Sequence, residues 1–241
     1  MGRHGTIAGR KAAQDAKRGQ IFTKYARAIS VAAKGGGDPE YNISLKHAID
    51  KAKSINMPND NINRAIQKGT GEGGGELYEQ GMFEGYGPGG VAVIVDVLTD
   101  NKNRTSSAIK HAFDKNGGNL GVPGCVNFMF ERKGIILIEK TDFTEEDALM
   151  ELALEAGAQD IIMHEDCFEV QTLPEVYDPV FKGLKDAGYD FVEADVELVP
   201  SVEATPDQSD LKNLVKLIDM LEENDDVQKV YHNSAIPLET E

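Results

Sequence analysis

The chain has little of what marks a secreted, membrane or metal-binding protein. It contains no tryptophan and two cysteines, Cys125 and Cys167, which belong to no CxxC pair, so neither a zinc site nor a disulfide framework is expected. No apolar run approaches the roughly 18 residues of a membrane span. The first residues, MGRHGTIAGRK, lack the apolar stretch of a secretory signal. We therefore expect a soluble, cytoplasmic protein whose cysteines are buried free thiols.

The residue patterns of common enzyme classes are absent as well. The five histidines show no metal-ligand spacing, and no HExxH or GxSxG motif occurs. Acidic pairs such as Asp225-Asp226 fall at expected helix ends or turns, where a solvated surface explains them better than a catalytic dyad. The sequence therefore predicts a protein that is not an enzyme, with no catalytic residue, cofactor, metal or small-molecule substrate.

What the chain does have is a charge division along its length. Residues 1–69 carry thirteen Lys/Arg and five Asp/Glu, whereas residues 134–241 carry six Lys/Arg and twenty-eight Asp/Glu. Solubility requires only a net charge and does not explain a basic end on an acidic body. The division predicts that the N-terminal end meets a polyanion and the acidic body does not.

The basic end reads as three short amphipathic helices. Apolar residues recur at helical spacing from Gln20 to Lys34, and a Gly-rich turn ends that helix. Asp38-Pro39 is expected to open a second helix, which reaches about Ile55, and the segment 57–60 caps a third. These helices predict a small bundle in a domain of residues 1–75, closed by the Gly-rich linker 69–75.

The rest of the chain alternates between strands and helices. Strands are expected at Leu77–Gly85, Val91–Leu98 and Cys125–Arg132, and residues 134–199 have the order βαββαβ of a ferredoxin-like domain. A final helix and strand lack a core of their own. The sequence thus predicts an α+β fold with two ferredoxin-like domains, in which an acidic domain, 134–204, is inserted into a discontinuous one, 76–133 with 205–241.

The candidate binding residues are basic. On the first helix the cations lie opposite the apolar face, where they suit phosphate contacts, although a merely solvated basic face is the alternative. Lys102 and Arg104 come near the start of another helix, which favours anions, and ordinary capping by Asn103 explains that segment equally well. The predicted nucleic-acid contacts are Arg10, Lys11, Lys17, Arg18, Lys24, Arg27, Lys34, Lys102 and Arg104.

Five sequence runs of this chain together resemble one known protein family. RKAAQDAKRGQIFTK, VAAKGGGDPE, IDKAKSINMPNDNINRAIQKGTG, EGYGPGGVAVIVDVLTDNKNRT and HAFDKNGGNLG resemble the YebC/PmpR family nearly continuously over residues 10–133, and the acidic remainder resembles it more loosely. The resemblance implies an N-terminal helical domain and two α+β domains, one inserted in the other. Many relatives open with His-Ser-Lys-Trp, whereas this chain opens with Arg3-His4-Gly5 and has no tryptophan.

The resemblance implies a role in gene expression. The family is described as transcriptional regulators that bind DNA, and its mitochondrial relatives are similar to the translational activator of cytochrome c oxidase subunit I. Our first hypothesis is therefore a DNA-binding transcriptional regulator, and the alternative is a translation factor that contacts rRNA or tRNA on the ribosome. The acidic domains are expected to contact protein, and no membrane partner is expected.

Overall fold

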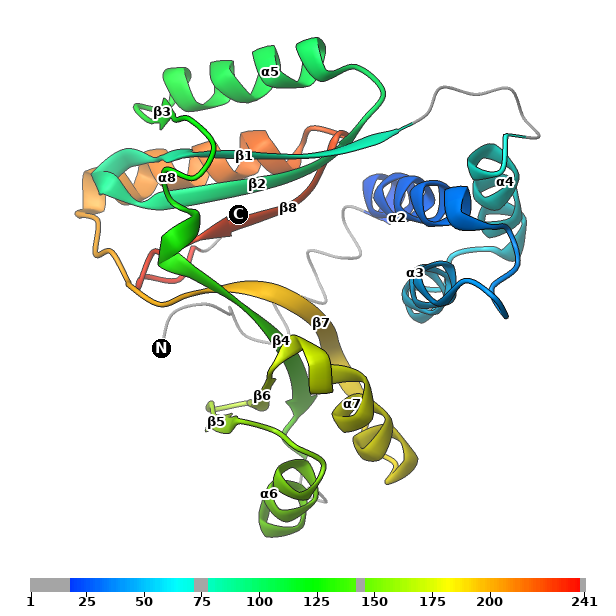
Figure 1. Cartoon of the computed structure of the whole chain (residues 1–241). Coiled ribbons are helices and arrows are strands. Elements are labelled where there is room, and N and C mark those ends of the chain that lie inside the picture. The colour runs from blue at the N-terminus through cyan, green and yellow to red at the C-terminus, as the bar shows by residue number, and fades with distance from the viewer. Residues whose placement is uncertain (1–17, 72–77, 142–145, 239–241) are drawn as a thin grey trace. The chain divides into compact units, whose positions relative to one another are not determined.

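The computed structural model describes residues 18–71, 78–141 and 146–238 (Figure 1). Within these ranges the chain divides into two compact units. The first unit contains residues 18–71, 78–127 and 206–232, and the second contains residues 128–141, 146–205 and 233–238. None of the helices within the described ranges is long and apolar enough to cross a membrane.

Three helices at the start of the first unit form a bundle around one apolar core. They are α2 (Arg18–Ala32), α3 (Ile43–Ser54) and α4 (Asn59–Gly69). The buried side chains that they share are those of Ile29, Ala33, Leu45, Ile49, Ala52, Met57, Ile62 and Ala65. A Cβ atom on Gly69 would overlap the Ser30 carbonyl oxygen, so the glycine lets α4 approach α2 closely. The predicted three-helix bundle is confirmed.

The start of the second helix differs from the prediction. We expected it at Asp38-Pro39, but α3 begins at Ile43 because Asn42 is the N-cap, its Oδ1 accepting a hydrogen bond from the Leu45 amide. The Asn42 side-chain amide also donates to the carbonyl oxygens of Ala32 and Gly36. One side chain therefore caps α3 and fixes the turn after α2. Residues 72–75 of the predicted linker lie outside the described ranges.

A four-stranded sheet with two helices completes the first unit. Its strands are β1 (Glu79–Tyr86), β2 (Ala92–Thr99), β3 (Asn119–Leu120) and β8 (Val227–His232). Their order is β3-β1-β2-β8, and all pairs are antiparallel. The helices α5 (Lys102–Lys115) and α8 (Gln208–Glu222) contact each other. The strand β8 thus joins the sheet that β1 begins about 150 residues earlier in the sequence (Glu79 to Val227).

The second unit contains a sheet of the ferredoxin-like kind. Its strands are β4 (Phe130–Glu139), β5 (Asp160–Met163), β6 (Cys167–Thr172) and β7 (Phe191–Pro200), and its helices are α6 (Glu146–Glu155) and α7 (Tyr177–Asp186). The strand order is β5-β6-β4-β7, with antiparallel pairs throughout. The predicted α+β class is confirmed, while the division into three domains with the stated boundaries stays a prediction.

One pair of predicted strands is wrong. We expected a strand at 125–132 and another from 134, but β4 is a single strand that runs through Gly134. A Cβ atom on Gly134 would overlap Thr172 Oγ1 and lie 2.6 Å from Tyr177 Cδ2. The glycine is therefore there for close packing inside a strand and not for a turn. Short 3-10 turns complete the described structure: η1 (Ala33–Gly35), η2 (Pro88–Gly90), η3 (Asn127–Met129) and η4 (Pro174–Val176).

Candidate nucleic-acid interface

The nine predicted contact residues have three different outcomes. Arg10, Lys11 and Lys17 lie outside the described residues, and Arg18 is the first residue of α2. The structure places the remaining five side chains: Lys24, Arg27, Lys34, Lys102 and Arg104. All five bind groups of the protein itself inside the first unit, so their structural roles are considered first.

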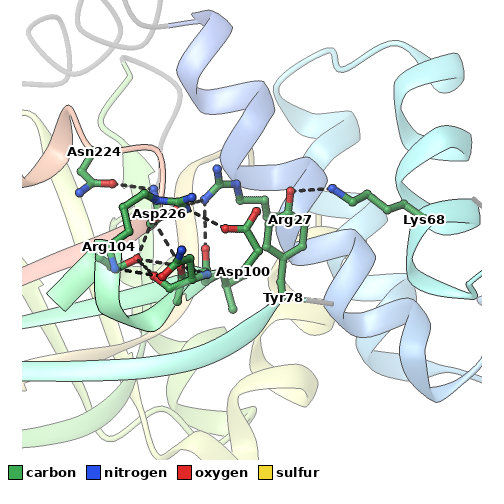
Figure 2. A network of polar contacts seen from close by, with 11 residues as sticks. Arg27, Lys68, Tyr78, Asp100, Arg104, Asn224 and Asp226 are labelled. Atoms are coloured by element: carbon green, nitrogen blue, oxygen red, sulfur yellow. Dashed lines mark hydrogen bonds and ion pairs between the residues drawn. The ribbon is translucent and has the colours of Figure 1, made fainter. Parts of the chain in front are cut away.

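Asp226 is the centre of this internal network (Figure 2). It immediately precedes β8, and its side chain is only 4% exposed. The Arg27 guanidinium from α2 donates to Asp226 Oδ1 and, at 3.1 Å, to the Leu98 carbonyl oxygen. The Arg104 guanidinium from α5 donates to both carboxylate oxygens, at 3.1 and 2.8 Å. A single carboxylate thus joins the helical bundle to the sheet that follows it.

A hydroxyl group also binds the carboxylate, and the backbone of Asp226 is held by a neighbouring side chain. Thr105 Oγ1 donates to Asp226 Oδ2 at 2.7 Å, and the Asp226 amide donates to Asn224 Oδ1 at 2.9 Å. Burial by itself raises the pKa of Asp226, but the hydrogen bonds from Arg104, Thr105 and Arg27 outweigh burial and hold that pKa below its ordinary value. Asp226 is therefore ionised and fully engaged at neutral pH.

Arg104 also closes the start of α5. It binds Asp100 Oδ1 at 2.7 Å, and together with Asp226 this raises the pKa of its guanidinium above the ordinary value. Its backbone amide donates to Asn101 Oδ1, so the N-cap of the helix is Asn101 and not Asn103 as we expected. The Arg104 side chain is still 53% exposed, because the carboxylates take only one side of the guanidinium. Of the two cations expected at this helix start, Arg104 is held from inside.

Tyr78 contacts three cations of the helical bundle. The guanidinium of Arg27 and the ammonium of Lys68 lie 5.1 and 4.4 Å from the centre of its ring, and Lys68 also donates to its hydroxyl at 2.8 Å. Lys34 Nζ donates to the Tyr78 carbonyl oxygen, and Lys24 Nζ to the carbonyl oxygen of Glu222 at 3.2 Å. These contacts use cation–π attraction and charge-assisted hydrogen bonds to position the basic helix.

Lys102 behaves differently from Arg104. It pairs with Glu79 across two side chains that are 69% and 59% exposed, so water screens the pair strongly. The hydrogen bond and charge of Lys102 lower the pKa of Glu79. The Lys102 ammonium group is therefore accessible to an anion from solvent.

Two cations that the sequence reasoning missed lie on α3. Lys46 and Lys53 are exposed, and their spacing of seven residues puts them on one face of the helix. The exposed Asp50 lies between them on that face and reduces its positive potential. The outward face could have been found from the same helical periodicity that located the core residues Leu45, Ile49 and Ala52. The sequence prediction rests instead on the denser cluster in residues 1–34 and on Lys102 and Arg104.

An exposed aromatic residue precedes these two lysines. The Tyr41 side chain is 91% exposed, and Ile43 is 70% exposed at the first position of α3. Asn42 between them is fixed by its three hydrogen bonds, so the turn presents both side chains to solvent. A solvated aromatic ring beside lysines can stack on an unpaired base while the ammonium groups meet phosphates.

The sequence of this chain matches two family models. That of the TACO1/YebC second and third domain matches residues 78–234, and that of the TACO1/YebC protein N-terminal domain matches residues 3–72. This chain belongs to the TACO1/YebC family. The resemblance to YebC/PmpR proteins that the five sequence runs indicated is thereby confirmed.

Relatives within the TACO1/YebC family align over nearly the whole chain. A probable transcriptional regulatory protein of Clostridioides difficile (strain 630) is 59% identical over 235 residues, which are 97% of this chain and 98% of that protein. Another, of Geobacillus sp. (strain WCH70), is 53% identical over 227 residues, 93% of this chain and 92% of that protein. A crystal structure of a conserved hypothetical protein from Aquifex aeolicus superposes with a TM-score of 0.84 at 44% identity, covering 92% of each chain.

Proposed function

We propose that this TACO1/YebC protein regulates gene expression by binding nucleic acid, and that its target is DNA. The observation that carries the proposal is the relationship to proteins named probable transcriptional regulatory protein, at 59% identity over almost the full length of both chains. The chromosome and the ribosome, the two targets weighed for this family, both place the protein in the cytoplasm.

The charge of the bundle supports the same proposal on physical grounds. Residues 18–71 contain nine Lys/Arg against four Asp/Glu. Phosphates of a nucleic acid interact with such a surface mainly through charge and counterion release, without reading the base sequence. Base-specific contacts are not evident, so we expect recognition of the backbone or of nucleic-acid shape to dominate.

The structure changes which side chains should be tested. Arg27 is 12% exposed and holds Asp226, so its substitution would damage the fold and the binding surface together. Lys46 and Lys53 are exposed, and neither is part of the Asp226 network. These two lysines therefore report on nucleic-acid binding with the least risk of unfolding.

We expect the double variant K46Q/K53Q to bind duplex DNA more weakly and with a flatter salt dependence. Each lost phosphate contact should reduce the slope of log K against log [salt] by about 1, hence by about 2 for the pair. Fluorescence anisotropy from 50 to 200 mM salt measures both quantities. The control is K182Q/K185Q, which removes two exposed cations from α7. Equal slopes of log K against log [salt] for the wild type and K46Q/K53Q would show that α3 is not part of the interface.

The nature of the target is tested in cells. Ultraviolet crosslinking of the tagged full chain, followed by sequencing of the attached nucleic acid, should recover chromosomal DNA in excess over RNA. Recovery of rRNA or tRNA instead would overturn the DNA target and support the translation-factor alternative. Absence of any crosslink above the K46Q/K53Q background would argue against nucleic-acid binding through α3.

A further inference from the structure

The helix α4 of the bundle has one buried side and one exposed side. Ile62 and Ala65 are buried, and Ser30 Oγ from α2 donates to the Ala65 carbonyl oxygen at 2.8 Å. The exposed residues on the opposite side lie within an arc of about 100°, because each residue turns a helix by about 100°. They are Asp60, Asn63, Arg64 and Gln67, and we call them the polar face of α4. Packing from behind thus presents this face on a rigid element.

The fold does not account for the side chains of the polar face. Asn63 lies in the interior of α4, although asparagine is a poorer helix former than alanine. The side chains of Asn63, Arg64 and Gln67 make no hydrogen bond or ion pair with another described residue. A residue that opposes a local preference without a structural gain is expected at a functional site. Their donors and acceptors are free to bind a ligand.

A short, fixed turn leads into α4. Four residues, 55–58, separate α3 from α4. The backbone of Asn56 has a φ of 59°, in the left-handed region, and the Met57 amide donates to the Ala52 carbonyl oxygen at 3.0 Å. The Met57 side chain is buried in the core of the bundle. A turn of this length joins the two helices of helix-turn-helix proteins, in which the second helix enters the major groove of DNA.

We propose that α4 lies in the major groove of duplex DNA and that its polar face binds base edges there. This inference rests on the proposed function, because it specifies how the DNA would be recognised. An arginine such as Arg64 suits N7 and O6 of guanine, and the amides of Asn63 and Gln67 suit N6 and N7 of adenine. Phosphate contacts still supply most of the affinity, and α4 adds a preference among sequences.

Asp60 distinguishes contact with bases from contact with the backbone. Its exposed carboxylate lies at the N-terminal end of the polar face and would repel a phosphate. The same carboxylate can accept a hydrogen bond from the amino group of cytosine. From Asp60 to Gln67 the face is about 10.5 Å long, because a helix rises about 1.5 Å per residue. Base pairs are spaced about 3.4 Å apart, so the face covers about three of them.

The charge of the bundle and the shape of the groove together favour duplex DNA as the occupant. Residues 18–71 carry nine Lys/Arg against four Asp/Glu, so the bundle attracts a polyanion. The major groove of B-form DNA is about 12 Å wide and admits a helix. The major groove of paired RNA is too deep and narrow for side chains to reach the bases. The polar face therefore suits duplex DNA and not paired RNA.

Selection from a library of random duplexes tests the preference among sequences. The full-length wild type, at about 150 mM salt, should enrich duplexes that share a motif of about three base pairs. Fluorescence anisotropy then compares the selected duplex with a scrambled duplex of the same length and composition. We expect the selected duplex to bind about 100-fold more tightly, because each good base contact discriminates by about tenfold.

The variant N63A/Q67A removes two amides from the polar face without changing its charge. It should reduce the preference for the selected duplex by about tenfold or more and leave the affinity for the scrambled duplex unchanged. Alanine favours the helix at both positions, so the variant keeps its fold, which thermal unfolding followed by circular dichroism verifies. The matched control Q208A/N213A removes one glutamine and one asparagine from exposed positions of α8 and should keep the full preference.

Altered bases test the groove directly. Replacing the purines of the selected motif by 7-deazapurines removes their N7 acceptors from the major groove and leaves the phosphates and the base pairing in place. This change should weaken binding of the wild type by about tenfold or more and should have no further effect on N63A/R64A/Q67A. Equal preferences of the wild type and N63A/Q67A, or a wild type that is insensitive to 7-deazapurines, would overturn the proposal. Equal affinity for paired RNA of the selected sequence would also overturn it.

The same measurements separate this inference from the proposed function. If the wild type binds the selected and scrambled duplexes equally and with a steep salt dependence, the protein binds DNA without reading bases through α4. The proposed function then stands and this inference is overturned. If the wild type binds no duplex DNA, the proposed function fails and the role of α4 in the major groove fails with it.

Discussion

Replacement of Asp226 by asparagine is the sharpest test of how the first unit is held together. The change preserves the size of the side chain and removes its charge. Arg27, which is 12% exposed, then loses its carboxylate partner but stays in place between α2 and β2, because it still donates to the Leu98 carbonyl oxygen. The variant therefore leaves a largely buried guanidinium without a counter-charge.

The expected cost can be worked from burial. Breaking a buried ion pair from one side costs about 3–5 kcal/mol, because the remaining charge is desolvated and unpaired. Arg27 keeps some water and its ring contact with Tyr78, so the lower end of that range applies. Arg104 is 53% exposed and regains water, so its lost pair adds at most about 1 kcal/mol. We expect D226N to lower the free energy of unfolding by about 3 kcal/mol.

Urea unfolding of the full chain, followed by fluorescence of its tyrosines and by circular dichroism, measures this loss. The matched control is D225N, because Asp225 is the exposed neighbour of Asp226, and it should change stability by less than about 0.5 kcal/mol. A loss below about 1 kcal/mol for D226N, or an equal loss for D225N, would refute the reasoning that the carboxylate holds α2 to the sheet.

The pH dependence of the same variant has a definite sign. The folded-state pKa of Asp226 lies below its ordinary value of 3.8, so its contribution is fully present above about pH 4 and is lost as the pH falls through the folded-state pKa. The stability difference between the wild type and D226N should therefore be constant from pH 7 to pH 5 and shrink below pH 4. A difference that grew on acidification would contradict a lowered pKa.

Two further substitutions test local structure. Burial raises the pKa of Glu84, but three backbone amides of the segment 124–127 donate to its carboxylate and lower the pKa overall. The E84Q variant should therefore lose about 1–3 kcal/mol of unfolding free energy, and hydrogen exchange of those amides should become faster. Unchanged exchange would show that the loop keeps its structure without Glu84. The G134A variant should lose about 1–3 kcal/mol of unfolding free energy through overpacking. Its control is G183A on α7, where the added Cβ atom would lie 3.7 Å from its nearest neighbour and should stabilise the fold by about 0.5 kcal/mol. Equal urea midpoints for the two variants would contradict the packing role of Gly134.

Local patterns in the sequence were enough to predict the bundle and the class of fold. Helical spacing of apolar residues located α2 and α4, and the βαββαβ order identified the second sheet. The same local rules failed where a residue serves a distant contact. Gly134 resembles a turn residue in sequence, but its missing side chain makes room for Thr172 and Tyr177, which come more than thirty residues later.

The candidate site shows the same division between local and distant information. The clustering of cations in the first helix was visible, but the partners of Arg27 and Arg104 were not. The sequence predicts that Asp226 is part of a solvated acidic pair, because Asp225-Asp226 follows an expected helix. Only the tertiary structure shows that the second member of the pair turns inward and neutralises two arginines that the sequence had assigned to phosphates.

The position of Asp226 in the chain also sets an order of events during synthesis. It is made 122 residues after Arg104 and 199 residues after Arg27. At roughly 5–20 residues per second, Arg27 waits on the order of 10–40 seconds for its carboxylate. Until then α2 is a basic helix with an unneutralised arginine, and β2 lacks its neighbour β8. The closing step of this unit therefore comes long after the bundle is synthesised, and a chain cut before Asp226 would keep its helical bundle without the ion pair that joins it to the sheet.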